Sequence, residues 1–398
     1  MTREKQQVPA GLLELLGKPQ TASVCLFDIP RKGGATYDSL RRVEEYLAQG
    51  RGVLRLTCGG ADGGLIATAH YRDLNASFTL SGLPELFAAH IPKFHTILVT
   101  NIAGWTLPEA YHKKASPVGE GRPRWIPAIA RLISRLAEFW EARLEFVVKD
   151  FLSVCPNFTL LNDEEQLHYC GVPGPDGCEA CLRQPFMRTS LGPSFTIAAW
   201  RNPWEDFLSR ANAIICPSFS SRDILLRAFS PANEVVQVLP YAPLFLPATP
   251  LALPGRDTPM HIAVVGQITA PKGAKIVRDL ALLLQERNPQ ARLTLVGTLA
   301  APGIQLPDTV RVTGPYEKER LADVLHNLGV TIGLVSSVWP EPFHFVTQEL
   351  MNLGLPLVCF DLGAPAERIR NWEHGMVAQE VSAQAALNTL EALDARRG

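Results

Sequence analysis

Residues 261–288 read HIAVVGQITAPKGAKIVRDLALLLQERN, and this stretch decides the fold. The apolar run 261–266 predicts a buried strand, and the segment from residue 272 onward follows the helical period. A glycine-bearing loop joins the two. Further strands are predicted in ARLTLVG, TVRVTG, VTIGLVSS and LPLVCFDLG, with helices between them. Strands that alternate with helices in this way are typical of parallel α/β folds.

The first half of the chain has the same pattern. The sequence predicts a strand at 22–27, a loop with two adjacent glycines, an amphipathic helix, and a second strand at 52–57. A long amphipathic helix is predicted at 127–142. Further strands are predicted at 65–69, 95–100, 144–148 and 213–216. Two arrays that each open with strand, glycine loop and helix predict a duplicated Rossmann architecture.

A proline-rich stretch separates the two arrays. Residues 239–259 contain six prolines, which prevent helix and disfavour sheet. We therefore expect one domain at 1–240 and another at 241–398. The segment from about 151 to 190 is rich in Pro, Gly, Asp and Cys and follows neither the helical nor the strand period. It is interpreted as a loop insertion on the first domain.

Composition excludes several classes of protein. The 398 residues are 46% hydrophobic and 19% charged, which indicates a globular chain of more than one domain. The 38 Lys and Arg nearly balance the 39 Asp and Glu, so there is no basic field to attract nucleic acid. The first twenty residues lack a signal-peptide core, and no apolar run is long enough to span a bilayer. We expect a soluble cytoplasmic protein, with peripheral contact at the inner membrane face left open.

Two carboxylates mark the strongest candidate site. Residues 340–349 read PEPFHFVTQE, in which seven residues separate Glu341 from Glu349. Glu341 should lie in the loop at the carboxyl end of a strand, and Glu349 about two turns into the next helix, with Pro342 suited to its first turn. Ligands bind at this edge of parallel sheets, and a helix N-terminus offers free N–H groups to a diphosphate. The alternative is a solvated acidic pair on a helix surface.

Several motifs occur in order along the second half: Gly266, Lys272-Gly273, Gly314 before a Tyr, Glu341-x7-Glu349, Gly354-Leu-Pro356-Leu, and Gly363 with Glu367. Together they resemble the second domain of retaining GT-B glycosyltransferases of the family 4 type (glycosyl transferases group 1). The first half resembles the family more loosely, through Asp28-x4-Gly33-Gly34, Trp200-Arg201 and Cys216-Pro217-Ser218. The resemblance implies two Rossmann-like domains facing each other across a cleft. It also implies transfer of a sugar from a nucleotide-sugar donor to an acceptor hydroxyl, with retention at the anomeric carbon.

The resemblance implies a role for each matching residue. Lys272 would pair with the donor diphosphate, Glu341 would hold hydroxyls of the transferred sugar, and Glu349 would bind the ribose. A glycine loop lets the first-domain backbone approach the phosphates closely. The other implied donor-binding residues are Gly33, Gly34, Gly266, Phe343, His344, Phe345 and Thr347. Catalysis would then depend on positioning and on electrostatic support of the departing diphosphate.

Three positions depart from the family pattern. Gln267 follows Gly266 in a region where members often have an arginine. Lys149-Asp150 stands where many show a His-Asp pair, and both residues are included among the catalytic candidates. The alternative for Lys149 is a surface lysine at a strand end. His344 stands where a Tyr is common, so a packing or capping role is weighed against a catalytic one.

Four of the eight cysteines fall in the predicted insertion, with the spacing C-x14-C-x7-C-x2-C: Cys155, Cys170, Cys178 and Cys181. The closing Cys-x2-Cys would place two thiolates on one tight turn, a common half-site for tetrahedral zinc. The pattern predicts structural zinc, with an iron–sulfur cluster as the main rival and redox-active thiols as the alternative. Related glycosyltransferases resemble this segment, so we interpret it as a subgroup feature on the acceptor side of the cleft.

Other functions are weighed against glycosyl transfer. A nucleotide-sugar epimerase shares the two-domain scaffold, but Glu341-x7-Glu349 with Lys272 speaks against it. A catalytically silent sugar-nucleotide-binding subunit is kept as an alternative because the usual His and Arg are missing. A redox sensor in the cysteine segment is a third reading. The acceptor classes considered are a glycan, a lipid-linked intermediate, or another compound with a free hydroxyl. The resemblance alone implies a setting in bacterial surface polysaccharide or glycoconjugate synthesis.

Overall fold

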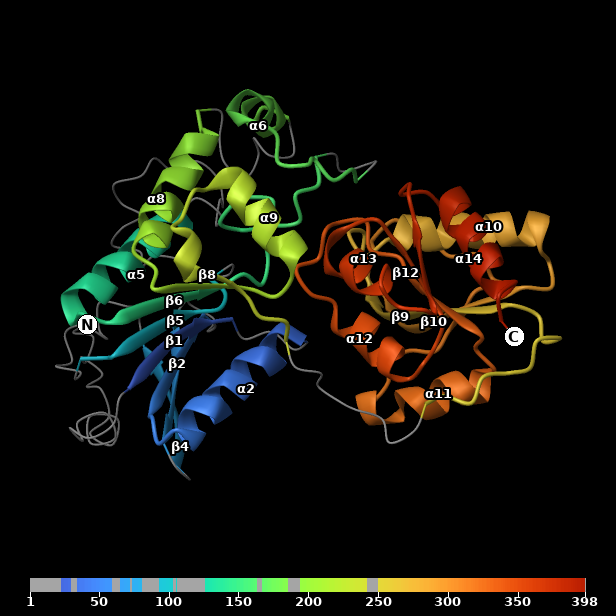
Figure 1. Cartoon of the computed structure of the whole chain (residues 1–398), viewed down its shortest axis with the longest axis horizontal. Helices are drawn as coiled ribbons and strands as arrows, with labels where there is room; N and C mark the ends of the chain where they lie inside the picture. Colours follow the sequence, from blue (N-terminus) through green and yellow to red (C-terminus); the bar gives the residue numbers. More distant parts are fainter. Residues whose placement is uncertain are drawn as a thin grey trace, which may run out of the picture. The chain divides into compact units, whose positions relative to one another are not determined.

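The computed structural model of the chain describes residues 23–29, 34–58, 65–71, 74–80, 93–102, 105, 126–162, 167–184, 194–241 and 250–397. The chain divides into two compact units (Figure 1). The first unit comprises residues 1–158, 172–216 and 224–239, and the second 159–171, 217–223 and 240–398. The main boundary therefore lies at the start of the proline-rich stretch.

Among the described residues, the first unit contains an eight-stranded sheet of order β4-β3-β2-β1-β5-β6-β7-β8. Its strands are β1 (Val24–Asp28), β2 (Val53–Cys58), β3 (Leu65–Tyr71), β4 (Leu74–Leu80), β5 (Thr96–Val99), β6 (Arg143–Val147), β7 (Ala213–Cys216) and β8 (Val236–Val238). Pairing is parallel from β2 across to β8, whereas β3 and β4 add an antiparallel edge. The central β1 is buried along its whole length, as its continuous apolar run requires.

The helices that the structure describes between residues 34 and 228 are α2 (Gly34–Ala48), α5 (Ile126–Trp140), α6 (Pro175–Leu182), α8 (Ile197–Ser209) and α9 (Phe219–Ala228). Helices α5 and α8 pack side by side (Figure 1). On α8, the rings of Trp204 and Phe207 each lie 5.6 Å from the ring of Phe146 on β6, measured between centroids. Trp200 donates a hydrogen bond of 2.8 Å to the carbonyl of Leu152. This aromatic cluster holds the strand that leads to the Lys-Asp pair.

The second unit contains, within its described residues, a six-stranded sheet of order β11-β10-β9-β12-β13-β14 with parallel pairing throughout. Its strands are β9 (His261–Ile268), β10 (Arg292–Leu299), β11 (Arg311–Val312), β12 (Ile332–Val335), β13 (Leu357–Phe360) and β14 (Gly375–Ala378). Its helices are α10 (Ala274–Arg287), α11 (Leu321–Leu328), α12 (Phe345–Asn352), α13 (Gly363–Ile369) and α14 (Ala383–Asp394). In Figure 1, α10 and α14 lie side by side above the sheet and α11 lies below it. The predicted α/β fold is confirmed.

The strand order of the second unit reverses between two neighbouring strands. The chain runs from β9 outward to β10 and β11, then returns to β12 on the other side of β9 and continues to β13 and β14. The loops after β9 and β12 therefore leave the same edge of the sheet in opposite directions. In open parallel sheets, such a switch point is where ligands bind.

The insertion is more regular than expected. The sequence predicts a loop without periodicity from about 151 to 190, but α6 (Pro175–Leu182) occupies part of it. Pro175 stands at the start of this helix and Asp176 in its first turn, and both are favourable there. At eight residues, α6 is too short to show a clear helical period, which is why the pattern missed it.

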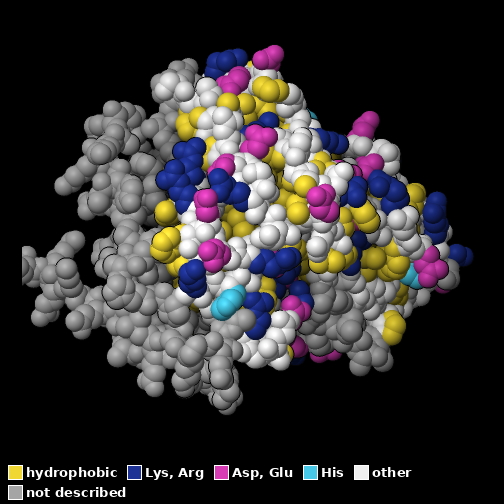
Figure 2. Space-filling view, turned by 60° about the vertical axis from the view of Figure 1, so that its left-hand side comes forward, with side chains coloured by type: hydrophobic (Ala, Val, Ile, Leu, Met, Phe, Trp, Pro, Cys, Tyr) yellow, Lys and Arg dark blue, Asp and Glu magenta, His cyan; other side chains and the backbone are white. Residues whose placement is uncertain are grey.

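Two surface features bear on the expected setting of the protein. No helix within the described ranges is long and apolar enough to cross a membrane. Figure 2 shows acidic and basic side chains interspersed on the face that it presents. The expectation that nucleic acid is not a partner stays a prediction.

Two glycines lie opposite each other in the pairing of β9 with β10. Gly266 lies opposite Gly297, and both have positive φ, 117° and 140° respectively. A Cβ on Gly297 would lie 2.0 Å from the carbonyl oxygen of Gly266. Only glycine allows the two backbones to approach so closely at the strand ends that lead to the site.

Substitution Gly297→Ala is expected to lower the free energy of unfolding by about 3 kcal/mol, because the left-handed φ and the backbone clash each add roughly 1–3 kcal/mol. Gly303→Ala is the matched control, since its φ is also positive (80°) but its Cβ would meet nothing within 4 Å. The control should lose about 1 kcal/mol. Urea denaturation measures both, and an equal loss in the two variants would contradict the close approach.

Candidate functional site

The loops after β9 and β12 are locked together. Ser336 Oγ donates a hydrogen bond of 2.7 Å to the carbonyl of Lys272, and Val338 N donates one of 3.0 Å to the carbonyl of Pro271. Gly273 has φ 84°, and a Cβ there would lie 1.9 Å from the carbonyl oxygen of Ser336. The lysine loop therefore lies directly against the loop that leads to the first carboxylate.

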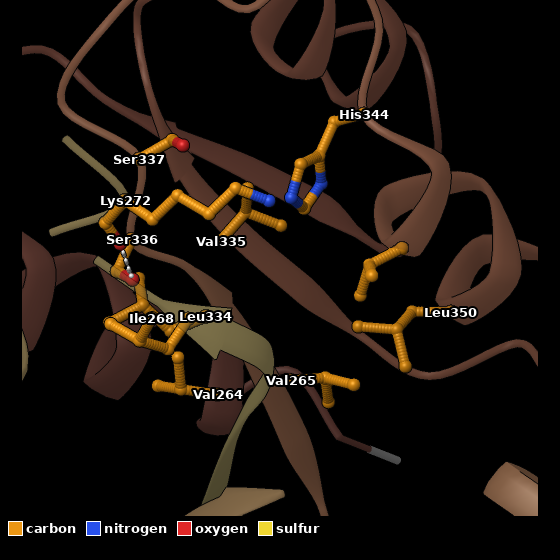
Figure 3. Close-up of a pocket in the computed structure, with 11 residues that line it drawn as sticks. Val264, Val265, Ile268, Lys272, Leu334, Val335, Ser336, Ser337, His344 and Leu350 are labelled. Carbon is orange, nitrogen blue, oxygen red and sulfur yellow. Dashed lines mark hydrogen bonds between the residues drawn. The ribbon is translucent and has the colours of Figure 1, made fainter. Parts of the chain in front are cut away.

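A small pocket lies at this edge of the second unit (Figure 3). It is lined by Val264, Val265, Ile268, Lys272, Leu334, Val335, Ser336, Ser337, His344, Val346 and Leu350. Strand residues make one side of it apolar. The amino group of Lys272 points toward the ring of His344 (Figure 3). A positive charge and an imidazole thus converge at the switch point.

His344 is the N-cap of α12. Its Nδ1 accepts a hydrogen bond of 3.1 Å from Thr347 N and lies 2.7 Å from Thr347 Oγ1. Burial lowers the pKa of His344 to about 4; Glu341 opposes this shift, and Lys272 adds to it. The imidazole is therefore neutral at pH 7. Because Nδ1 accepts the cap bond, the proton is assigned to Nε2, which lies 3.8 Å from Glu341 Oε1.

Glu341 is buried and held from both sides. Ser337 Oγ donates a hydrogen bond to Glu341 Oε1, and Ala364 N donates one of 2.9 Å to the Glu341 carbonyl. Gly363, at the start of α13, has φ 62°, and a Cβ there would lie 2.7 Å from Glu341 N. Helix α12 begins at Phe345, so Pro342 lies before the cap and outside the first turn where the sequence predicts it. The Glu341 carboxylate is therefore positioned by the loop before α12 and not by the first turn of the helix.

Glu349 lies on α12 and is 7% exposed. Neither of its carboxylate oxygens has a hydrogen-bond partner among the described residues. Lys318 Nζ lies 3.6 Å from Oε1, too far for a hydrogen bond. Burial raises the pKa of Glu349, and the charge of Lys318 opposes this. A buried carboxylate with unused acceptors is suited to a ligand that brings hydroxyl groups.

The two phenylalanines of the motif pack together. Phe343 and Phe345 have ring centroids 4.8 Å apart, and Tyr241 contacts both, at 4.9 and 5.6 Å. The guanidinium of Arg368 lies 4.8 Å from the Phe343 ring centroid. The aromatic side chains thus pack the motif loop against Tyr241 and Arg368. Thr347 is fully buried beside the cap, and Gly266 lies near the end of β9.

Lys149 belongs to the first unit and is buried, so its interpretation as a surface lysine is wrong. Its Nζ donates a hydrogen bond of 2.5 Å to Ser39 Oγ and lies 3.4 Å from Asp38 Oδ2. Burial lowers the pKa of Lys149 to about 8, against the charges of Asp38 and Asp28. The ion pair ties α2 to the end of β6.

Asp150 is fixed in place beside this lysine. Asn101 Nδ2 donates a hydrogen bond of 2.9 Å to Asp150 Oδ2, and Leu152 N donates one of 2.9 Å to Oδ1. Gly34 is the first residue of α2, whereas Gly33 lies outside the described residues. Lys149 and Asp150 therefore lie next to each other at the carboxyl end of β6.

Several residues that hold the candidate site residues in place were not identified from the sequence. Ser337 and Lys318 contact the two motif carboxylates, and Asp38 and Ser39 hold Lys149. Only Ser337 has a local signal, because it is a polar residue at the end of an apolar strand. The others are brought together by the tertiary fold and have no motif of their own.

The predicted zinc site is not supported. Among the residues that the structure describes, no three His, Cys, Asp or Glu side chains form a group that could hold a metal ion. Cys178 and Cys181 lie within α6, not on a tight turn. Arg201 Nη2 donates a 3.4 Å contact to Cys178 Sγ, and a guanidinium beside the sulfur opposes a metal cation. An iron–sulfur cluster needs the same four thiolates and is not supported either.

Residues 253–394 match the family model described as Glycosyl transferases group 1. This match covers the β9–β12 switch point and both motif carboxylates. No curated protein sequence matches the chain.

Solved structures share the fold of the whole chain. The Anabaena HepE protein in complex with UDP has a TM-score of 0.56 at 14% identity, with 95% of this chain and 91% of that chain covered. Sucrose-phosphate synthase from Thermosynechococcus elongatus has a TM-score of 0.55 at 17% identity, with 94% and 90% covered. The catalytic domain of Arabidopsis thaliana starch synthase IV, bound to ADP and acarbose, has a TM-score of 0.55 at 12% identity, with 95% and 92% covered. The fold is that of GT-B glycosyltransferases, and with the domain match it supports a glycosyltransferase.

Capping by His344 predicts the behaviour of two variants. His344→Ala should lower the free energy of unfolding by about 1 kcal/mol, whereas His344→Asn, which can cap the helix, should lose only a few tenths. The folded pKa lies below the ordinary value, so wild-type stability should fall, relative to His344→Asn, as pH drops from 6.5 toward 4. Urea denaturation across this range measures both effects. An asparagine variant as unstable as the alanine variant would argue against the cap.

Burial of Lys149 predicts a second pH dependence. The pKa of Lys149 is lowered to about 8 in the folded protein, so the unfolded chain binds more protons between pH 8 and 10. Wild-type stability should therefore rise over that interval relative to Lys149→Met, which cannot titrate. Denaturation of both proteins at pH 7, 8, 9 and 10 gives the difference. A difference that is constant with pH would indicate that Lys149 is exposed or titrates normally.

Proposed function

We propose that this protein transfers a sugar from a nucleotide-sugar donor to an acceptor hydroxyl, with retention at the anomeric carbon. The observation that carries the proposal is the convergence of Lys272, Glu341 and His344 at the β9–β12 switch point, with Glu349 just over one turn into the adjoining helix. This convergence lies within the domain that matches the glycosyl transferases group 1 model. Solved relatives of the fold hold UDP or ADP, which supports a nucleoside diphosphate as the leaving group.

Each residue has a chemical role in this proposal. The ammonium of Lys272 and the backbone N–H groups at Phe343 to Phe345, at the start of α12, would bind the diphosphate. Glu341 would accept hydrogen bonds from hydroxyls of the transferred sugar. The unused oxygens of Glu349 would accept the two ribose hydroxyls. On the resemblance alone, Gly33, Gly34 and Asp150 of the first unit are retained as donor- and acceptor-side residues.

The proposed reaction is balanced without an added reagent. The bond between the anomeric carbon and the diphosphate oxygen breaks, and the acceptor oxygen forms its bond on the same face of the sugar. The acceptor proton passes to the departing diphosphate. Lys272 and the α12 N-terminus stabilise the charge that develops on the leaving group, and neutral His344 can donate a hydrogen bond from Nε2. Positioning supplies most of the remaining acceleration.

The donor site is tested with a thermal-shift panel of UDP, GDP, ADP and TDP and their common sugar conjugates. One nucleotide family should raise the melting temperature of wild type, since binding at a hundredfold excess over Kd stabilises by about 2.7 kcal/mol. Glu349→Ala should abolish the shift. Glu286→Ala on the exposed face of α10 is the matched control and should keep it. A shift that survives in Glu349→Ala would count against the assigned ribose contact.

Turnover distinguishes the proposal from its rivals. With the donor so identified, Glu341→Ala should keep nucleotide binding and lose about 10²–10³-fold in kcat, and NMR of the product should show the donor's anomeric configuration. Nucleotide binding without transfer by wild type would favour the silent subunit, which the missing arginine near Gln267 supports. Interconversion of donor sugars without an acceptor would favour an epimerase. Surface polysaccharide or glycoconjugate synthesis is the proposed setting.

A further inference from the structure

Lys318 is the residue that the proposed mechanism leaves without a role. It opens the 3-10 turn η3 (Lys318–Arg320), which lies before α11 and is remote in sequence from the carboxylate motif. We propose that Lys318 is the counter-ion that keeps Glu349 charged before nucleotide arrives, and that it thereby sets the pH range in which the protein binds nucleotide. This inference rests on the proposed function, because it takes Glu349 as the ribose-binding carboxylate.

The geometry of the pair suits a counter-ion. Lys318 Nζ lies 3.6 Å from Glu349 Oε1, with the lysine side chain 28% exposed and the glutamate side chain 8% exposed. At this distance the charges attract strongly in a partly buried setting, but no hydrogen bond forms. Both carboxylate oxygens therefore keep their acceptor capacity for a ligand. A tighter ion pair would consume the acceptors that the ribose needs.

Two other ionisable groups lie near Glu349, and neither of them lowers its pKa as Lys318 does. Glu319, exposed on the same 3-10 turn, raises the pKa of Glu349 by like-charge repulsion. Tyr316 lies near Glu349, and burial together with that carboxylate raises the pKa of its phenol, so Tyr316 stays neutral. Within the described residues, burial and Glu319 thus raise the pKa of Glu349, and Lys318 lowers it; the charge state of Glu349 depends on the balance of these effects.

The sign of the effect on binding follows from this balance. Protonated Glu349 loses acceptor capacity, so nucleotide affinity should fall as pH drops through its pKa. Removing Lys318 raises that pKa further, so the loss of nucleotide affinity on acidification (the acid limb of the affinity profile) begins at higher pH. Removing the charge of Glu319 moves the limb to lower pH. A lysine that merely contacted the diphosphate would instead change affinity by a similar factor at every pH.

The experiment measures Kd by calorimetry from pH 5 to 9, with whichever of UDP, GDP, ADP or TDP stabilises wild type. Lys318→Met should bind more weakly than wild type at the acid end of this range, by up to about tenfold for a shift of one pKa unit, and nearly normally at pH 9. Glu319→Gln should shift the limb in the opposite direction. Lys318→Arg should restore the wild-type profile. Lys93→Met, which breaks an exposed ion pair with Glu141 in the first unit, is the control for loss of a lysine.

Two kinds of failure are distinguishable. A uniform loss of affinity in Lys318→Met at every pH, or no change at all, would overturn the role of Lys318 while leaving the donor site intact. Wild type that binds no nucleotide, or Glu349→Gln that binds like wild type at every pH, would overturn the proposed function itself. If Lys318→Met fails to fold, the affinity profile of Glu319→Gln still tests the proposal. An acid limb at the same pH as in wild type would show that the neighbouring charges do not set the charge state of Glu349.

Discussion

The close approach of the loops after β9 and β12 is the constraint on which the candidate site depends. Gly273 lies so near the carbonyl of Ser336 that any side chain would collide with it, and Ser336 in turn bonds back to the carbonyl of Lys272. This contact exists because the strand order reverses between β9 and β12, so two loops that are distant in sequence leave the sheet together. The position of the lysine beside the carboxylate loop follows from it.

Burial then shifts the pKa values of His344 and Glu349 at that edge. His344 is neutral because it is desolvated beside a lysine and because its Nδ1 is committed to the α12 cap. Glu341 is held by Ser337 and by the backbone contacts of α13, whereas Glu349 keeps its acceptors. The same residue types thus acquire different chemistry from their surroundings. A group that is positioned but left unsatisfied is what a ligand site requires.

Much of the site could be predicted from the sequence, because its central motif is local. Lys272 and Glu341 each follow a recognisable buried strand, and Glu349 lies on the helix that comes next. The burial of Lys149 could not be predicted, because Ser39, which accepts its hydrogen bond, lies 110 residues away in the chain. The zinc prediction is not supported, for a related reason. Cysteine spacing gives the separation of the thiols along the chain, but it does not reveal that part of the segment is helical or that Arg201 of α8 contacts Cys178.

The sequence by itself determined the α/β class, the order of strands and helices in the second unit, and the position of the motif along the chain. These follow from apolar periodicity and from glycines at strand ends, which are properties of neighbouring residues. The tertiary structure alone decided that His344 caps a helix, that Lys149 is buried against Asp38, and that Lys318 faces a carboxylate. Burial and charge depend on groups that are distant in the chain and meet only when the sheets form.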